Sequence, residues 1–248
     1  MALGRITPID RLLQPVHRWV WGDVDRRIRK LFAFGEVETD GGRDILRAAE
    51  ITPDPLLRRL YLEHAIDELR HGVLFRERGA ALLQGRSVRP DAANPGGVLP
   101  GGHGLDDLQV EHEPDHRLLA FLHVAEKAAA GRFTLYREMV DDDPATRAIF
   151  EHILRDEVFH MNYTHTQLAR VAPQSYRRQV WRARASRLWK RYLRVAASLA
   201  GVLGGAMLLV QYFVLLPPFA WAAKRRERRE RPGWITIANQ HESPTSQY

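Results

Sequence analysis

The sequence predicts an all-α protein in which a four-helix bundle is followed by an apolar C-terminal helix. The first supporting observation is that apolar residues recur at intervals of three and four along four long segments. The second is the motif D-E-x-x-H, which occurs at 67–71 and again at 156–160, 89 residues later. The third is an uncharged stretch of 22 residues at 195–216, long enough as a helix to cross ~30 Å of hydrocarbon.

Composition limits the classes of function. The 248 residues suit one domain of ordinary size with appendages. The chain contains no cysteine, which excludes disulfides, thiolate metal sites and iron–sulfur clusters. Residues 1–30 lack the continuous apolar core of a signal peptide, so we expect the bundle to lie on the cytoplasmic side.

The net charge of +7 is concentrated near the C-terminus. Residues 173–231 hold 14 basic and 2 acidic residues, whereas the rest of the chain is acidic overall. Nucleic acid and an anionic membrane surface are the two partners that such a region suits. Because the basic residues flank an apolar stretch and no nucleic-acid-binding motif is recognised, we expect membrane lipids and no nucleic acid.

Residues 1–22 are predicted to form an amphipathic N-terminal arm. Its apolar residues at near-helical spacing are Leu12, Leu13, Val16, Trp19 and Val20. Such an arm either lies on a membrane or packs against the bundle, and the pattern leaves both open. The bundle itself is expected at 23–172.

The first half of the bundle is predicted as two helices, Val24 to about Ala49 and Pro55 to about Leu83. The second helix turns one seam toward the core, and this seam contains His64, Glu68 and His71. Burying a lone carboxylate costs on the order of several kcal/mol or forces it to keep a proton. A metal ion would be the partner that such an acid needs.

The second half repeats this plan. Residues 85–114 are rich in glycine and proline and are predicted to be a long crossover. Helices are expected at about 114–140, with Glu126 among small apolar residues, and at about 144–172, with Glu157 and His160 facing the core. A proline precedes the motif glutamate by 13 residues in both halves.

The spacing of E-x-x-H suits metal binding, because residues three apart on a helix project from one face about one turn apart. A single copy is weak evidence, but here each copy follows another glutamate. Glu68 follows Glu36 by 32 residues, and Glu157 follows Glu126 by 31. The predicted metal ligands are Glu36, Glu68, His71, Glu126, Glu157 and His160. Glu38 is the alternative to Glu36: it lies nearer the apolar stripe, whereas Glu36 better matches the level of Glu68.

With this set, residues 24–172 resemble the ferritin-like dimetal-carboxylate superfamily, in which two helices each give a Glu and two others each give Glu-x-x-His. The resemblance implies two iron ions, or a manganese–iron pair, bridged by Glu68 and Glu157. It also implies that Asp67 and Asp156 hydrogen-bond ligand imidazoles and fix their tautomers; the alternative for each is a plain surface charge. His64 either supports the site or is a core histidine with satisfied hydrogen bonds.

The C-terminal region, 173–231, is predicted to be a basic linker helix and a membrane segment that spans about 195–216 and ends at Pro217-Pro218, before a polar tail at 232–248. Four tryptophans bracket the apolar stretch, as is typical of membrane interfaces: Trp181, Trp189, Trp221 and Trp234. A buried C-terminal helix is the alternative. Basic residues at both ends leave a single span and a re-entrant segment open.

These features favour a membrane-attached diiron oxidoreductase, a monooxygenase or desaturase that uses O₂ on a lipid-soluble substrate. In plan the chain is most similar to the small membrane-bound hydroxylases of quinone biosynthesis. Without cysteine, electrons must come from an external donor or from a reducing substrate. Two alternatives stay open: iron or peroxide handling, similar to ferritins and rubrerythrins, and a membrane-complex subunit with a structural dimetal site. The oligomeric state, including a homo-oligomer, is also open.

Overall fold

A computed structural model describes residue 6 and residues 8–86 and 110–227. Most of the predicted crossover and all of the predicted polar tail lie outside the described residues. The described residues are almost entirely helical and include no strand, which confirms the all-α prediction. The chain divides into two compact units, residues 1–187 and residues 188–248.

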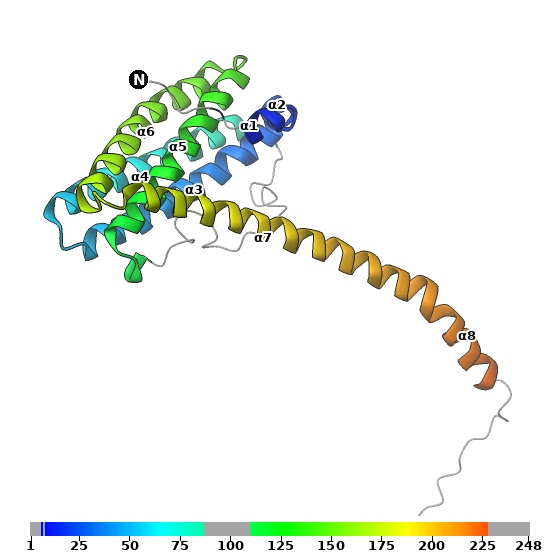
Figure 1. The fold of residues 1–248 in the computed structure, drawn as a ribbon. Helices are drawn as coiled ribbons and strands as arrows, with labels where there is room; N and C mark the ends of the chain where they lie inside the picture. Colours follow the sequence, from blue (N-terminus) through cyan, green and yellow to red (C-terminus); the bar gives the residue numbers. More distant parts are fainter. Residues whose placement is uncertain (1–5, 7, 87–109, 228–248) are drawn as a thin grey trace, which may run out of the picture. The chain divides into compact units, whose positions relative to one another are not determined.

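Four long helices and two short ones make up most of the first unit, and Figure 1 shows their arrangement. The short helices are α1 (Pro8–Leu12) and α2 (Gln14–Trp21), and the long ones are α3 (Val24–Ile51), α4 (Pro55–Leu83), α5 (Asp115–Met139) and α6 (Pro144–Val171). A 3₁₀ turn at Val110–His112 precedes α5, and α7 (Tyr176–Val210) begins in this unit. The bounds of the long helices lie within two residues of the predicted ones.

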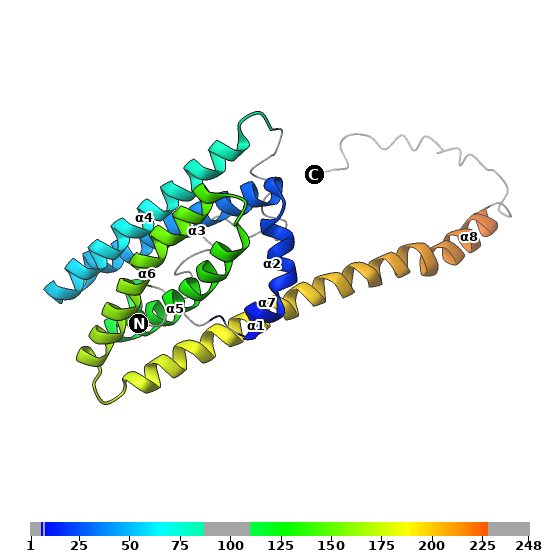
Figure 2. The same ribbon diagram turned by 90° about the horizontal axis from the view of Figure 1, so that it is seen from above.

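The long helices form a bundle-like arrangement of two helix pairs. Helix α3 packs along α4, α5 packs along α6, and α4 contacts α6 (Figures 1 and 2). Aspartates cap the helix starts: Asp54 accepts hydrogen bonds from the backbone N–H groups of Leu56 and Leu57, and Asp143 accepts one from Thr146. In both α4 and α6 a proline then occupies the first turn, where its missing N–H costs nothing.

Two apolar clusters fill the interior of the first unit. One contains Leu57, Tyr61 and Leu118, and the other contains Phe75 and Phe150, each with further buried neighbours. Along α4, α5 and α6 the acids and histidines of interest lie between the residues of these two clusters. The bundle therefore has a polar layer enclosed by apolar layers on both sides.

The end of the N-terminal arm packs against the bundle at Trp21, whereas four of the apolar residues that predicted the arm are exposed: Leu12, Leu13, Val16 and Trp19. Trp21 is fully buried, and its ring meets that of Phe150 at 5.3 Å between centroids. Its carbonyl accepts two hydrogen bonds from the buried Arg27, whose guanidinium also pairs with Asp142 and Asp143. One cation thus ties the arm to the turn between α5 and α6.

Glycines let α3 and α4 approach closely. A Cβ atom at Gly35 would lie 3.1 Å from the Gly72 carbonyl oxygen, and one at Gly72 would collide with the Thr39 hydroxyl. A Cβ at Gly42 would lie 3.2 Å from the Glu68 Cβ. Because this contact excludes larger residues, it holds the polar side chains of α3 at the level of Glu68.

The second unit continues α7 through a π-helical turn at Gln211–Leu215 into α8 (Leu216–Glu227). The helix therefore runs through Pro217 and Pro218, and the prediction that this pair ends it is wrong. Because prolines cannot donate to the carbonyls one turn earlier, a wider turn just before them takes up the change without ending the helix.

The C-terminal helix carries the one segment, among the described residues, that is long and apolar enough to cross a membrane. All side chains described at 201–226 are exposed, including Leu203, Met207, Phe213 and Trp221. An exposed apolar surface of this extent needs a covering partner such as lipid or protein.

Candidate metal centre

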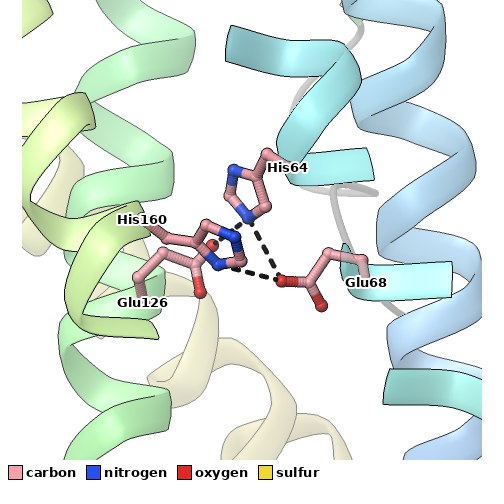
Figure 3. Close-up of side chains that lie close together, drawn as sticks. All are labelled: His64, Glu68, Glu126 and His160. Carbon is pink, nitrogen blue, oxygen red and sulfur yellow. Dashed lines mark hydrogen bonds and ion pairs between the residues drawn. The ribbon is translucent and has the colours of Figure 1, made fainter. Parts of the chain in front are cut away.

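The polar layer of the bundle contains two groups of metal-type side chains that share Glu68. The first group is His64, Glu68, Glu126 and His160, and the second is Glu38, Glu68 and His71. Within each group, one ligand-type atom per residue lies within 4.8 Å of the others. Figure 3 shows the first group converging, with His64 and Glu68 on α4 facing Glu126 and His160.

Two predicted ligands, Glu36 and Glu157, belong to neither group. Glu157 is nevertheless buried in the same layer, whereas the preference for Glu36 over Glu38 does not agree with the structure. The Glu36 side chain is exposed, and Glu38 is the acid that α3 brings to Glu68 and His71. The reason is the rotation of the helix. Gly35, Thr39 and Gly42 mark the buried face of α3, and Glu38 lies beside that face, whereas Glu36 points away from it.

The four acids of the layer form two contacting pairs. Glu38 contacts Glu68, and burial together with the Glu68 charge raises the pKa of Glu38 well above its usual value. Glu157 contacts Glu126, and burial together with the charges of Glu126 and Glu68 raises the pKa of Glu157. Two adjacent buried carboxyls hold a proton between them unless a cation neutralises them. The layer therefore favours positive charge.

Each imidazole of the repeated motif is held by the aspartate of the other copy. His71 Nε2 lies 3.0 Å from Asp156 Oδ2, and His160 Nε2 lies 3.2 Å from Asp67 Oδ2. An aspartate accepts from an imidazole N–H, so these bonds place the proton on Nε2 in both rings. The expectation that Asp67 and Asp156 orient the histidines agrees with this geometry.

Arg70 joins the two aspartates. Its Nη2 donates to Asp67 Oδ1 at 2.8 Å and to Asp156 Oδ2 at 2.9 Å. The hydrogen bonds from His71 and Arg70 outweigh burial and lower the pKa of Asp156 to about 2. Asp156 therefore stays ionised and remains an acceptor for the His71 ring N–H.

Three buried ligand-type atoms in the layer lack hydrogen-bond partners: His71 Nδ1, His160 Nδ1 and Glu157 Oε2. The two nitrogens face Glu68 at 3.8 and 3.5 Å. Unpartnered buried polar atoms are costly and rare. With the tautomers set by the aspartates, both Nδ1 lone pairs are directed at the acids, where a cation would accept them. The side chains thus fit a metal pair held by four carboxylates and two imidazoles.

His64 is fully buried and lies among the same acids. Its Nε2 lies 3.1 Å from Glu68 Oε1 and 3.4 Å from Glu126 Oε1, and its Nδ1 lies 2.6 Å from the Tyr163 hydroxyl. Burial acts to lower the pKa of His64, but hydrogen bonds to Glu126 and Glu68 outweigh it and raise the pKa to about 9. His64 is thus in contact with the predicted ligands.

Two contacts in the layer were not predicted from the sequence. One is that of Arg70 with the two aspartates, and the other is that of Tyr163 with His64. Arg70 lies inside the first motif copy, where the second has Phe159, and this difference was the available signal. The contact between Tyr163 and His64 joins positions 99 residues apart, and no local pattern indicates it.

Comparison with known proteins returned no relatives: no family model matches the chain, and no curated protein or solved structure matches it. The class of site is therefore defined by the geometry of the polar layer.

Proposed function

We propose that this chain is a membrane-attached dimetal-carboxylate protein with a ferritin-like bundle, and that its ions are two irons. The observation that carries the proposal is the set of three unpartnered buried atoms, His71 Nδ1, His160 Nδ1 and Glu157 Oε2, among four buried acids. A satisfied polar core would leave no such atoms, whereas a metal pair would use all three.

Charge supports a pair of divalent ions. Glu38, Glu68, Glu126 and Glu157 carry four negative charges when ionised, and two divalent cations balance them while the imidazoles stay neutral. Oxygen and imidazole donors without thiolate suit iron or manganese. Glu68 belongs to both groups, so its carboxylate is the one that both ions would contact.

We further propose that the activity is an O₂-dependent oxidation, hydroxylation or desaturation, of a lipid-soluble substrate. Two iron ions at this site would supply reversible redox chemistry toward O₂. In hydroxylation one oxygen atom enters the product and the other leaves as water, which takes up two electrons from a donor and two protons. Since the chain has no cysteine, the donor is a separate protein or the reduced substrate.

The rest of the chain is suited to this chemistry. The apolar clusters on either side of the layer, which include Leu57, Phe75 and Phe150, keep bulk water from the acids. The exposed apolar helix at 201–226 supports attachment to a membrane, where a lipid-soluble substrate is concentrated. We place the bundle on the cytoplasmic side.

The test is O₂ consumption by the iron-loaded full-length protein in detergent, with a lipid extract and a chemical reductant. We expect uptake of O₂ that depends on the extract, together with an oxygenated or desaturated lipid. Oxidation of ferrous iron far beyond two equivalents, without a lipid product, would instead identify an iron-handling protein. Two bound irons with neither activity would identify a structural site.

A further inference from the structure

The inference concerns His64 and deepens the proposed function, on which it rests. We propose that His64 is a seventh metal ligand, and that its Nε2 binds the ion held by Glu126 and His160. The two metal positions are then unequal. One has two imidazoles, from His64 and His160, and the other has the single imidazole of His71.

The first argument is position. His64 Nε2 lies 3.1 Å from Glu68 Oε1 and 3.4 Å from Glu126 Oε1. His160 Nδ1 lies 3.5 Å from the same Glu68 oxygen. Figure 3 shows these atoms facing a common point. A single ion at that point would be reached by two carboxylates and two imidazoles.

The second argument is the partner of the remaining ring nitrogen. Ligand histidines donate their other N–H to an acceptor that fixes the tautomer. His71 and His160 do so from Nε2 to aspartates. His64 Nδ1 lies 2.6 Å from the hydroxyl oxygen of the buried Tyr163, which is able to accept an N–H from that nitrogen. In the tautomer that donates to Tyr163, Nε2 is the nitrogen whose lone pair can meet the ion.

The third argument is the contact between two imidazoles. The rings of His64 and His160 stack at 3.7 Å between centroids with an interplanar angle of 23°. At this distance the two rings lie side by side, and one nitrogen of each, His64 Nε2 and His160 Nδ1, faces the same Glu68 oxygen, at 3.1 and 3.5 Å.

The fourth argument is asymmetry. The motif copies are offset by 89 residues, and the counterpart of His64 at that offset is Ile153, whereas that of Tyr163 is Leu74. The His64–Tyr163 pair is therefore an addition to one metal position of an otherwise repeated plan.

The experiment is proton NMR of the full-length protein in detergent, loaded with two equivalents of Co²⁺, whose paramagnetism shifts the ring N–H signals of bound histidines. We expect three shifted, solvent-exchangeable ring N–H signals in the wild type, and two in His64→Leu. His123→Leu is the matched control, because His123 is a partly buried histidine whose Nδ1 contacts the Met161 carbonyl outside the site; it should keep three.

The wild-type count requires no variant to fold and decides the matter by itself. Two shifted signals with two bound Co²⁺ ions would overturn the role of His64 and leave the dimetal site standing. Three signals that persist in His64→Leu would also overturn it. No bound Co²⁺ in the wild type would overturn both the dimetal site and the seventh ligand.

Discussion

His71 and Asp156 belong to different copies of the motif and are hydrogen bonded to each other across the bundle, with 3.0 Å between His71 Nε2 and Asp156 Oδ2. His160 and Asp67 make the reciprocal contact. Each copy therefore orients the histidine of the other, so neither half of the bundle can set up its imidazole alone. The role of the aspartate in D-E-x-x-H is therefore to orient the histidine of the other copy.

Asp156→Asn should weaken metal binding by about ten-fold or more, because the neutral amide no longer supports the basicity and orientation of His71. The measurement is competition of the loaded protein with a chelator of known affinity. Asp40→Asn is the control, since Asp40 pairs with Arg43 on the outside of α3, and its affinity should stay at the wild-type value. Equal affinity of the two variants would remove the role assigned to Asp156.

The two glutamates of α3 offer a matched pair. Glu38→Gln should lower the iron content to about one per chain, because Glu38 faces Glu68 and His71. Glu36→Gln should leave the content at that of the wild type, because Glu36 is exposed. Elemental analysis of both purified variants checks this, and the reverse order would show that α3 is rotated relative to the structure.

The glycine contact between α3 and α4 should be sensitive to one methyl group. Gly72→Ala places a Cβ against the Thr39 hydroxyl and the Gly35 carbonyl, and overpacking of this kind typically destabilises by about 1–3 kcal/mol. Gly41→Ala meets nothing within 4 Å, and in a helix it should be neutral or stabilise by up to about 1 kcal/mol. The free energy of unfolding of each variant, measured by denaturant titration of the helical signal, checks this. Equal effects of the two substitutions would contradict the close approach of α3 and α4.

Asp143 should contribute to stability at neutral pH and lose that contribution in acid. Burial acts to raise its pKa, but hydrogen bonds from Arg78 and Thr146 outweigh burial and lower the pKa to about 2. An acid whose folded-state pKa is depressed stabilises above its ordinary pKa near 4, and the effect fades as pH falls toward about 2.

Replacing Asp143 by Asn should therefore cost about 3 kcal/mol at pH 7, since Arg27 and Arg78 each lose a partner. The difference from wild type should shrink as the pH falls from 4 to 2. Unfolding free energies of both proteins across that range provide the measurement, and a difference independent of pH would show that the loss is one of packing.

The sequence predicted the helices well because their ends are set by local chemistry. Asp54-Pro55 and Asp143-Pro144 start α4 and α6 where the pattern indicated. The sequence did not distinguish Glu36 from Glu38. Side chains two positions apart on a helix point about 200° away from each other, and the number of residues to Glu68 does not show which of the two faces the core. The glycine contact that sets the rotation requires knowledge of both helices.

The pairing of the site residues depends on which helices are neighbours. The contact of α4 with α6 brings Asp67 to His160 and Tyr163 to His64, although these residues are far apart in the sequence. At Pro217-Pro218 the local rule itself was insufficient. The rule that proline ends a helix predicted an end here, but a π-helical turn just before the pair allows the helix to continue.

The central claim, a dimetal site in the polar layer, is tested most directly by the iron content of the full-length protein. The protein is purified in detergent, loaded anaerobically with ferrous iron, desalted and analysed beside Glu157→Gln, which keeps the size of the side chain and removes its charge. The wild type should hold two irons per chain and the variant no more than one. A wild type that holds no iron, or a variant that still holds two, would contradict the site.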